Sequence, residues 1–485
     1  MQRKFLTNLA LVLTLNLLIK PFWILGIDRL VQNHVGTVQY GYYYALFNFS
    51  FLLNIILDLG ITNFNNKNIA QNNHLLSKHF ASIVLLRIML SGVYCIVAII
   101  GGLIIGYSWV MMEMLLPLIL NQILISFILY LRSNLAGLHL FKTDSIISVL
   151  DRTIMIGICG FLLWRHTFDD PAGIRYFVYA QTCAYALTLI ITFFIVIEKA
   201  KVKRLAWRWP FFLMILKQSY PYAILVLLMT FYNRIDTVML ERMLDNGAEQ
   251  AGVYASAYRL LDATNMIAFL FAGLLLPIFA RMIKLKQSVE EMVRLSFSLL
   301  IVPAIIVATV SFFFRQDIMK LLYSHASGAS HVEESAKVFG ILMCCFVPIA
   351  STYIFGTLLT ANGSMKQLNI MAGTGMAVNI ILNLILIPRH QVVGSAFSSL
   401  TTQLLTSAAQ VLMVQLLFRF KINYKLLGSL GMFVILTILI NYYISSAHGN
   451  WVSHLVLGVA ASIGLAFIFK LISIRNLIYI VKYGE

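Results

Sequence analysis

Long apolar stretches alternate with short polar segments along almost the whole chain. About fourteen apolar stretches have about 20 residues each, which is the length that a helix needs to cross a bilayer. They begin near residues 6, 41, 80, 109, 144, 172, 218, 251, 291, 335, 364, 392, 426 and 451. The pattern predicts an all-α polytopic membrane protein of about 14 transmembrane helices, with no soluble domain of useful size.

Composition and charge agree with this pattern. The chain is 60% hydrophobic and only 11% charged, whereas soluble domains carry about 25% charged residues. The net charge of +17 is distributed unevenly: with a cytoplasmic N-terminus, the inner segments hold roughly 21 Lys and Arg and the outer segments roughly 7. The basic charge therefore predicts topology, with both termini in the cytoplasm, and argues against a nucleic-acid partner.

The residue types that carry catalysis or hold metals form no familiar pattern. The five cysteines are scattered within the apolar stretches, and the ten histidines show no paired ligand spacing. The sequence contains no P-loop, no GxGxxG and no GxSxG. We therefore expect no metal, no cofactor and no catalytic residue, so the protein is not expected to be an enzyme.

Two parts of the chain resemble each other. An Ile-Asp pair, a short polar loop and Gly-x-Tyr occur first at Asp28 and Gly41 and again at Asp236 and Gly252. This suggests two homologous six-span units in the same orientation, related by an axis along the membrane normal. The expected division is an N-lobe of spans 1–6 in residues 1–210, a C-lobe of spans 7–12 in residues 211–420, and spans 13–14 with a cytoplasmic tail in residues 421–485.

Five basic residues lie inside otherwise apolar stretches. They are Lys20, Arg87, Arg152, Arg234 and Arg259. A cation near the bilayer centre costs about 2.5–3.5 kcal/mol, so the fold must compensate for these charges. The pattern indicates a polar cavity between helices that receives an anion. Arg87 contributes least to this argument, because it lies about 10 Å from the inner end of its helix and its side chain could reach the interface.

Nearby acids leave two interpretations open for several of these cations. Lys20 either meets a substrate or pairs with a carboxylate. Arg259 either meets a substrate or is neutralised by Asp262, three residues further along the same helix face. Arg152 either forms a structural salt bridge between helices or contributes to substrate entry. Its neighbour Asp151 diverges from it by about 100° around the helix, so the two cannot form a tight pair.

Acidic residues near the ends of spans suggest gating or coupling. Asp28 and Asp236 hold equivalent positions at the outer ends of the two repeats, where they could exchange salt bridges or cap helix ends. Asp236 is two residues from Arg234, so their side chains point apart and each needs another partner. Asp58, near the inner end of span 2, is either an interfacial residue or a coupling site. The candidates for gating or coupling are Asp28, Asp58, Arg152, Asp236 and Asp262.

Three segments carry a resemblance to a known family. They are NLLIKPFWILGIDRL, YGYYYALFNFSFLLNIILDLGITNFNNKNIAQ, and GVYASAYRLLDATN followed by LLLPIFARM. With these the chain resembles the multidrug/oligosaccharidyl-lipid/polysaccharide (MOP) exporter superfamily, and within it the Wzx-type flippases for O-antigen and capsule repeat units. The resemblance implies a MATE-like fold: two six-helix lobes in a V, with spans 1, 2, 7 and 8 lining a central cavity, plus two extra C-terminal helices.

The resemblance also implies a function and a site. In the lipid II flippase branch, cavity cations on spans 1 and 8 are essential, and Lys20 and Arg259 occupy similar places here. Lysine in place of arginine on span 1 keeps the charge and loses the bidentate fork. We expect Lys20, Arg234 and Arg259 to bind the substrate.

The expected activity is translocation of undecaprenyl-pyrophosphate-linked oligosaccharide repeat units across the bacterial cytoplasmic (inner) membrane, for O-antigen, capsule or exopolysaccharide assembly. Membrane lipids are expected partners, and a polysaccharide polymerase and assembly proteins are further candidates. Two alternatives remain. A cation-coupled multidrug extruder needs buried acids where span 1 carries Lys20. A membrane-embedded glycan polymerase usually needs a large outer loop, and no outer loop here exceeds about 20 residues.

Overall fold

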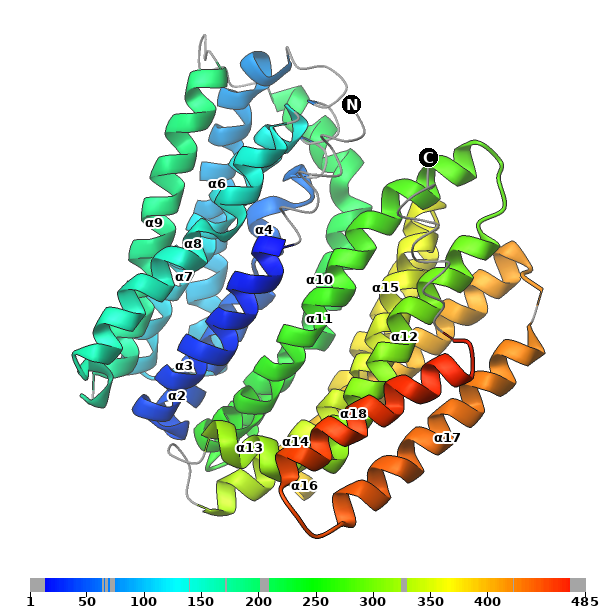
Figure 1. The fold of residues 1–485 in the computed structure, drawn as a ribbon. Coiled ribbons are helices and arrows are strands. Elements are labelled where there is room, and N and C mark those ends of the chain that lie inside the picture. Colours follow the sequence, from blue (N-terminus) through cyan, green and yellow to red (C-terminus); the bar gives the residue numbers. More distant parts are fainter. Residues whose placement is uncertain are drawn as a thin grey trace. The chain divides into compact units, whose positions relative to one another are not determined.

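A computed structural model describes residues 14–62, 65, 69, 75–138, 140–170, 172–200, 209–323, 329–421 and 423–471. Every regular element in these ranges is a helix (Figure 1). The chain forms two compact units, Met1–Ala255 and Ser256–Glu485. The division into lobes expected from the repeat, with boundaries at residues 210 and 420, stays a prediction.

The first unit begins with a helix whose winding changes after a proline. Residues 14–22 are α-helical, and the π-helix η1 (Trp23–Asp28) follows directly after Pro21. Proline lacks the N–H that an α-helix uses, so a wider turn near it is physically reasonable. Pro21 therefore lies inside the first span, which continues beyond it with a wider turn. The chain continues into α2 and turns at Gly36, which has a positive φ of 84°.

The remaining helices of the first unit surround an apolar core. The element bounds are α2 (Arg29–Val35), α3 (Thr37–Leu52), α4 (Ile55–Asp58), α6 (Leu75–Ile105), α7 (Trp109–Gly137), α8 (Phe141–Trp164), the 3-10 helix η2 (Thr167–Asp169), α9 (Gly173–Ala200), α10 (Trp209–Met243) and α11 (Gly247–Lys284). Helix α7 packs on α9, and α3 packs on α10 and α7. Leu86, Tyr130, Ile147, Val196 and Phe212 belong to one buried cluster that joins five of these helices. Helix α11 passes from the first unit into the second.

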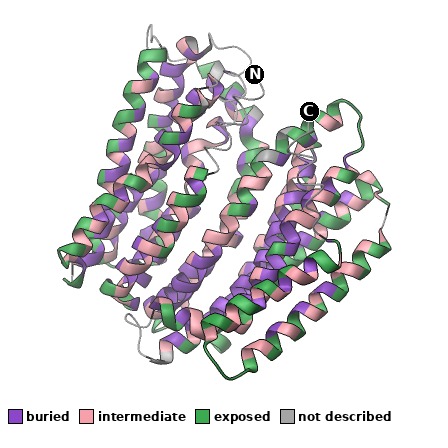
Figure 2. Cartoon of the chain, in the orientation of Figure 1, coloured by how far each residue is buried: buried purple, intermediate pink, exposed green. Residues whose placement is uncertain are grey.

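The second unit contains the rest of α11 and seven further helices. Their bounds are α12 (Glu290–Phe313), α13 (Arg315–Tyr323), α14 (Ala329–Cys344), α15 (Phe346–Ala361), α16 (Met365–Phe418), α17 (Tyr424–Ser446) and α18 (Trp451–Ile468). Helix α12 packs on α14, α15 and α17, and α15 packs on α16. The apolar segment His331–Ala361 is the most buried of the membrane-spanning candidates, and Figure 2 shows buried positions gathered along α15.

Two helical hairpins complete the second unit. Helix α16 reverses direction at Gln391, the one residue inside it with non-helical dihedrals (φ 47°, ψ −133°). Helices α17 and α18 lie side by side in Figure 1 and are joined by buried polar groups. Asn441 donates hydrogen bonds to the carbonyl oxygen of Thr437 (2.9 Å) and to Ser462 Oγ (3.0 Å).

These helices agree with the predicted spans. Eleven segments of the described chain are long and apolar enough to cross a membrane. Helix α16 holds two spans because it reverses at Gln391, and the helices over 14–35 and α3 correspond to the first two predicted spans. The predicted all-α fold of about 14 transmembrane helices is confirmed. Span 7 differs from its predicted start near residue 218, because α10 begins at Trp209 and contains Pro221 in its interior.

Candidate functional site

Lys20 lies near charged side chains of two helices of the first unit, α7 and α8. Its side chain is half-buried, and Arg152, Asp151 and Arg132 act on it electrostatically. Within the described part of the chain, no residue forms a hydrogen bond or ion pair with the Lys20 ammonium group. We call Lys20, Arg132, Asp144, Asp151 and Arg152 the Lys20 cluster. It holds three cations and two carboxylates.

The two arginines of the Lys20 cluster differ in their contacts. Arg132 Nε donates to Asp144 Oδ1 at 2.8 Å, and its Nη2 donates to Asp144 Oδ2 at 3.4 Å. Arg152 Nε lies 3.6 Å from Asp151 Oδ2, which is longer than a hydrogen bond and agrees with the divergence of adjacent helical residues. The Arg152 guanidinium also lies near the rings of Trp23 (5.7 Å) and Tyr185 (5.8 Å). Arg152 of α8 therefore faces η1 and α9.

Arg132 was missed by the sequence interpretation. It lies near the inner end of span 4, where the positive-inside rule explains a basic residue without any site. The one sequence signal was Asp144, twelve residues further on, because the two residues bracket the short turn between α7 and α8. Arg132 pairs with Asp144 and lies near Lys20, so it is more than a charge that sets the topology.

Arg234 lies against a row of aromatic rings on α3. Its Nη1 donates to Tyr44 Oη at 3.5 Å, and its guanidinium lies 5.5 Å from the centre of the Phe51 ring. Tyr40, Tyr44, Phe47 and Phe51 follow one another along this face, with neighbouring ring centres 6.1–6.4 Å apart. A guanidinium beside such rings gains cation–π energy and remains half-buried.

Asp28 and Asp236 have matching surroundings. Tyr40 donates its hydroxyl hydrogen to Asp28 Oδ1 at 2.9 Å, and Tyr254 donates to Asp236 Oδ2 at 2.7 Å. All four side chains are buried. In each repeat, therefore, an acid at the end of one span contacts a tyrosine of the next span. The gating role of both acids stays a prediction.

Asp58 and Arg87 form a structural ion pair. Arg87 donates to Asp58 Oδ1, to Thr62 Oγ1 (2.7 Å) and to Ser126 Oγ (2.8 Å), and its guanidinium lies 4.9 Å from the Tyr130 ring centre. The Arg87 side chain is 1% exposed. It does not reach the interface, because these partners hold it inside the unit. Asp58 therefore has a basic partner within the unit, and its role in gating or coupling stays a prediction.

Arg259 and Asp262 lie in the second unit on α11, three residues apart. Both side chains are half-buried. Their roles in substrate binding and coupling stay predictions. No group of three or more potential metal ligands occurs among the residues that the structure describes.

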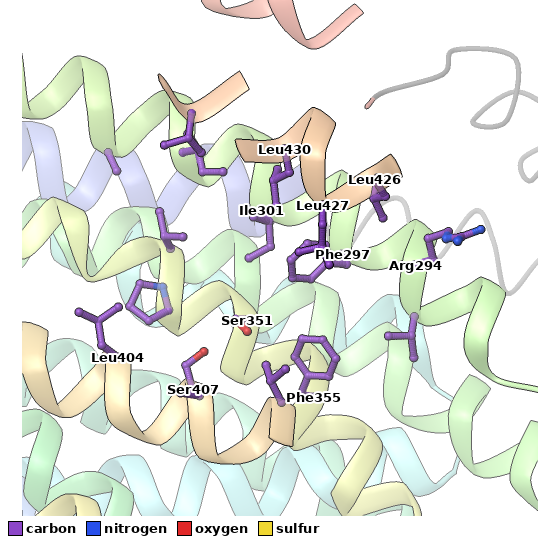
Figure 3. A pocket seen from close by; sticks show the side chains of 18 of the residues that line it. Arg294, Phe297, Ile301, Ser351, Phe355, Leu404, Ser407, Leu426, Leu427 and Leu430 are labelled. Carbon is purple, nitrogen blue, oxygen red and sulfur yellow. The ribbon is translucent and has the colours of Figure 1, made fainter. Parts of the chain in front are cut away.

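The second unit contains an apolar groove of about 890 Å³. Its walls come from α12, α14, α15, the second half of α16, and α17. Figure 3 shows the rings of Phe297 and Phe355 and the hydroxyl groups of Ser351 and Ser407 around it, with Arg294 at one end. Lys421 is the other basic residue of the lining. The lining is almost entirely apolar, and its charged residues are Arg294, Lys421 and the acid Glu290.

Comparisons with solved structures identify the same fold elsewhere. The lipid II flippase MurJ in an inward closed conformation has a TM-score of 0.72 at 13% identity, over 97% of this chain and 99% of that one. An inward-facing multidrug resistance MATE family transporter of the MOP superfamily has a TM-score of 0.62 at 13% identity, over 82% and 94%. A MOP superfamily transporter from Pyrococcus furiosus Vc1 gives 0.57 at 13% identity, over 85% and 95%. A search of curated proteins finds no match.

Two family models match the sequence. The model described as MatE covers residues 221–385. The model described as polysaccharide biosynthesis protein covers residues 5–283, which is more than half of the chain. With the fold described above, the chain belongs to the polysaccharide biosynthesis protein family, within the MOP exporter superfamily of multi-span membrane proteins.

Proposed function

We propose that this protein is a flippase that moves undecaprenyl-pyrophosphate-linked oligosaccharide repeat units from the inner to the outer leaflet of a bacterial cytoplasmic membrane. The exported units would serve O-antigen, capsule or exopolysaccharide assembly, where a polymerase would join them. The observation that carries the proposal is Lys20, a half-buried lysine within a membrane-spanning helix. The proposed step makes and breaks no bond, so the protein would bind and release its substrate unchanged.

Charge explains why such a substrate needs this site. A pyrophosphate carries two or more negative charges and cannot cross hydrocarbon without groups that replace its hydration. The Lys20 ammonium has three donors, and no described residue accepts from them. Nε and Nη2 of Arg132 already donate to Asp144. Arg132 would therefore add positive potential near the substrate and would not bind a phosphate with both of these groups. Arg234 and Arg259 are the further candidates for substrate contact as the protein alternates between conformations.

The apolar groove of the second unit is the proposed binding site for the isoprenoid chain of the substrate. Its lining is apolar over α12, α15, α16 and α17, while Arg294 and Lys421 supply positive charge. A polyprenyl chain is a long linear run of apolar isoprene units, so it could lie along such a groove while the phosphates remain near basic groups. Within the bilayer the chain leaves lipid and not water, so close packing in the groove would stabilise the complex.

The experiment compares Lys20→Ala with Lys142→Ala, which removes an exposed lysine near the start of α8. In a strain without the chromosomal copy, Lys20→Ala should abolish surface glycan and accumulate the lipid-linked repeat unit, at an unchanged protein level in the membrane. Lys142→Ala should export normally, and Lys20→Arg should retain export because the charge survives. Normal export by Lys20→Ala would contradict the assigned site.

A multidrug extruder is the second candidate, because the MatE model matches residues 221–385. Deletion of the whole protein separates the two functions. A flippase of repeat units should leave drug sensitivity unchanged and remove the surface glycan. Increased drug sensitivity with intact surface glycan would favour the extruder.

A further inference from the structure

Two histidines and one aspartate meet in the first unit, where α2 packs against the turn between α8 and α9. His34 lies in the last turn of α2, His166 directly precedes η2, and Asp169 is the last residue of η2. His34 Nδ1 lies 2.6 Å from Asp169 Oδ1, and His166 Nδ1 lies 3.3 Å from Asp169 Oδ2. Each carboxylate oxygen therefore has its own imidazole partner. We call these three residues the histidine cluster.

The bond between His34 and Asp169 joins segments that are 135 residues apart in the sequence. Helix α2 continues the helical segment that carries Lys20, and η2 follows α8, which carries three members of the Lys20 cluster. The same two spans are joined at a second place, where Asn16 Nδ2 donates to Ser148 Oγ at 3.0 Å. That second bond is buried and its groups do not titrate. The bond in the histidine cluster is the one whose strength can follow the pH.

The charge on Asp169 depends mainly on the two histidines. The hydrogen bond from His34 is the main reason why the pKa of Asp169 lies below its usual range, and His166 lowers it further. The Asp169 carboxylate is therefore ionised throughout the range in which histidines titrate. Arg175 is engaged by Glu113 at 3.3 Å. The charged residues that the adjoining segments add are Arg29 of α2, Arg165 after α8, Asp170 after η2 and Arg175 of α9.

Protonation of His34 changes the kind of bond that it makes. Its side chain is 35% exposed and that of Asp169 is 50% exposed, so both groups exchange protons with water. A histidine changes charge between about pH 5 and 8. A neutral imidazole donates an ordinary hydrogen bond to a carboxylate, whereas an imidazolium donates a charge-assisted bond that is roughly twice as strong. The bond should therefore strengthen as the pH falls from about 8 to 5.5, and weaken only when Asp169 itself is protonated.

We propose that the histidine cluster is a pH-sensitive contact, which holds the end of the span that carries Lys20 against the turn between α8 and α9 more strongly in acidic than in alkaline medium. The charge distribution predicts that this turn lies on the outer side of the membrane, where the pH follows the environment. Because both side chains are exposed, the effect is modest: such pairs change an equilibrium by up to about fivefold. The contact does not depend on the identity of the substrate.

The test measures amide hydrogen exchange over residues 29–36 in the purified full-length protein, at pH 5.5 and at pH 8. His34→Asn keeps a donor near the position of Nδ1 but cannot become positive, so it reproduces the neutral form of the contact. Comparing both proteins at the same pH cancels the effect of pH on the exchange chemistry. The wild type should exchange about two- to fivefold more slowly than His34→Asn at pH 5.5, and at about the same rate at pH 8.

Three further variants show whether the effect belongs to this contact. Asp169→Asn removes the anion and should exchange like His34→Asn at pH 5.5. His166→Asn should have a smaller effect, because its bond is longer and lies within one turn of the chain. His448→Asn is the matched control, since it removes an exposed histidine of the second unit, and it should exchange like the wild type.

Two results would overturn the pH-sensitive contact. One is the same ratio of exchange rates between wild type and His34→Asn at both pH values, and the other is an equal loss of protection in His448→Asn. The exchange measurement involves no glycan export. Slower exchange at pH 5.5 in a protein whose deletion leaves surface glycan intact would therefore support the contact and reject the proposed flippase function.

Discussion

Arg87 on α6 and Asp58 at the end of α4 form an ion pair that the first unit encloses. The arginine side chain is 1% exposed, and Thr62, Ser126 and Tyr130 complete its surroundings. The Asp58 side chain is 29% exposed, whereas the Arg87 guanidinium is enclosed and needs its partners because it cannot recover its hydration. The pair therefore ties α4, α6 and α7 together.

The Arg87→Ala variant should therefore unfold more easily than the wild-type protein. Loss of the guanidinium leaves the Asp58 carboxylate without its cation, and we expect a loss of about 3 kcal/mol in unfolding free energy. The measurement is thermal or denaturant unfolding of the purified protein in detergent. Arg175→Ala is the control, because Arg175 pairs with Glu113 at 3.3 Å with both side chains about half exposed. It should cost less than about 1 kcal/mol.

Arg259 either binds the substrate or only neutralises Asp262, and two variants distinguish these roles. If the arginine is structural, its removal leaves an uncompensated acid, and removal of Asp262 as well should restore export. We expect Arg259→Ala and Arg259→Ala/Asp262→Ala both to be inactive in glycan export at normal membrane levels. Arg259→Lys should keep partial activity, because the charge remains and the bidentate fork is lost. Wild-type export by the double variant would show that Arg259 is structural.

The groove of the second unit gives a third prediction. Ala408 lines the groove from α16, so Ala408→Trp should fill part of its volume and reduce export of the lipid-linked unit severalfold. Leu412→Trp is the matched control. Leu412 lies one helical turn further on, is 64% exposed and does not line the groove. The Leu412→Trp variant should therefore export the lipid-linked unit normally. Equal export by both variants would show that the isoprenoid chain does not use the groove.

Topology is tested by labelling single cysteines in intact cells. Asn246 lies exposed in the turn between α10 and α11, and Asn246→Cys should react with an impermeant reagent if this turn is outside. Lys203 lies outside the described residues, in the basic segment expected in the cytoplasm, and Lys203→Cys should stay unlabelled. The reverse labelling pattern would invert the topology derived from the positive-inside bias.

Much of the fold could be predicted from the sequence because membrane helices are specified by local properties. A span needs a certain length of apolar residues, and the predicted starts near 109, 364 and 451 agree with Trp109, Met365 and Trp451 at the starts of α7, α16 and α18. Both ends of a span are visible in the sequence itself. Partners from distant helices are not required to recognise them.

The candidate site was harder to predict, because a buried charge depends on neighbours that are distant in sequence. The depth of Arg87 suggested that it could reach the interface, and only the contact with Asp58, 29 residues away, shows that it does not. Arg132 looked like an ordinary inner-face charge until its position near Lys20 was known. The bond between Asp28 and Tyr40 could not be foreseen either, because it joins two different helices.

The reversal of α16 at Gln391 also has a consequence for how such proteins can vary. Two spans are joined there by a single non-helical residue, and Gly394 lies so close that a Cβ on it would be 2.4 Å from the carbonyl oxygen of Leu386. Insertions and epitope tags are tolerated at exposed loop tips, whereas the exposed tip of this hairpin, residues 388–391, has only one non-helical residue. Differences in length between relatives should therefore accumulate in turns such as 447–450 and avoid 390–394. The same hairpin presents only one non-helical residue, Gln391, to antibodies and proteases.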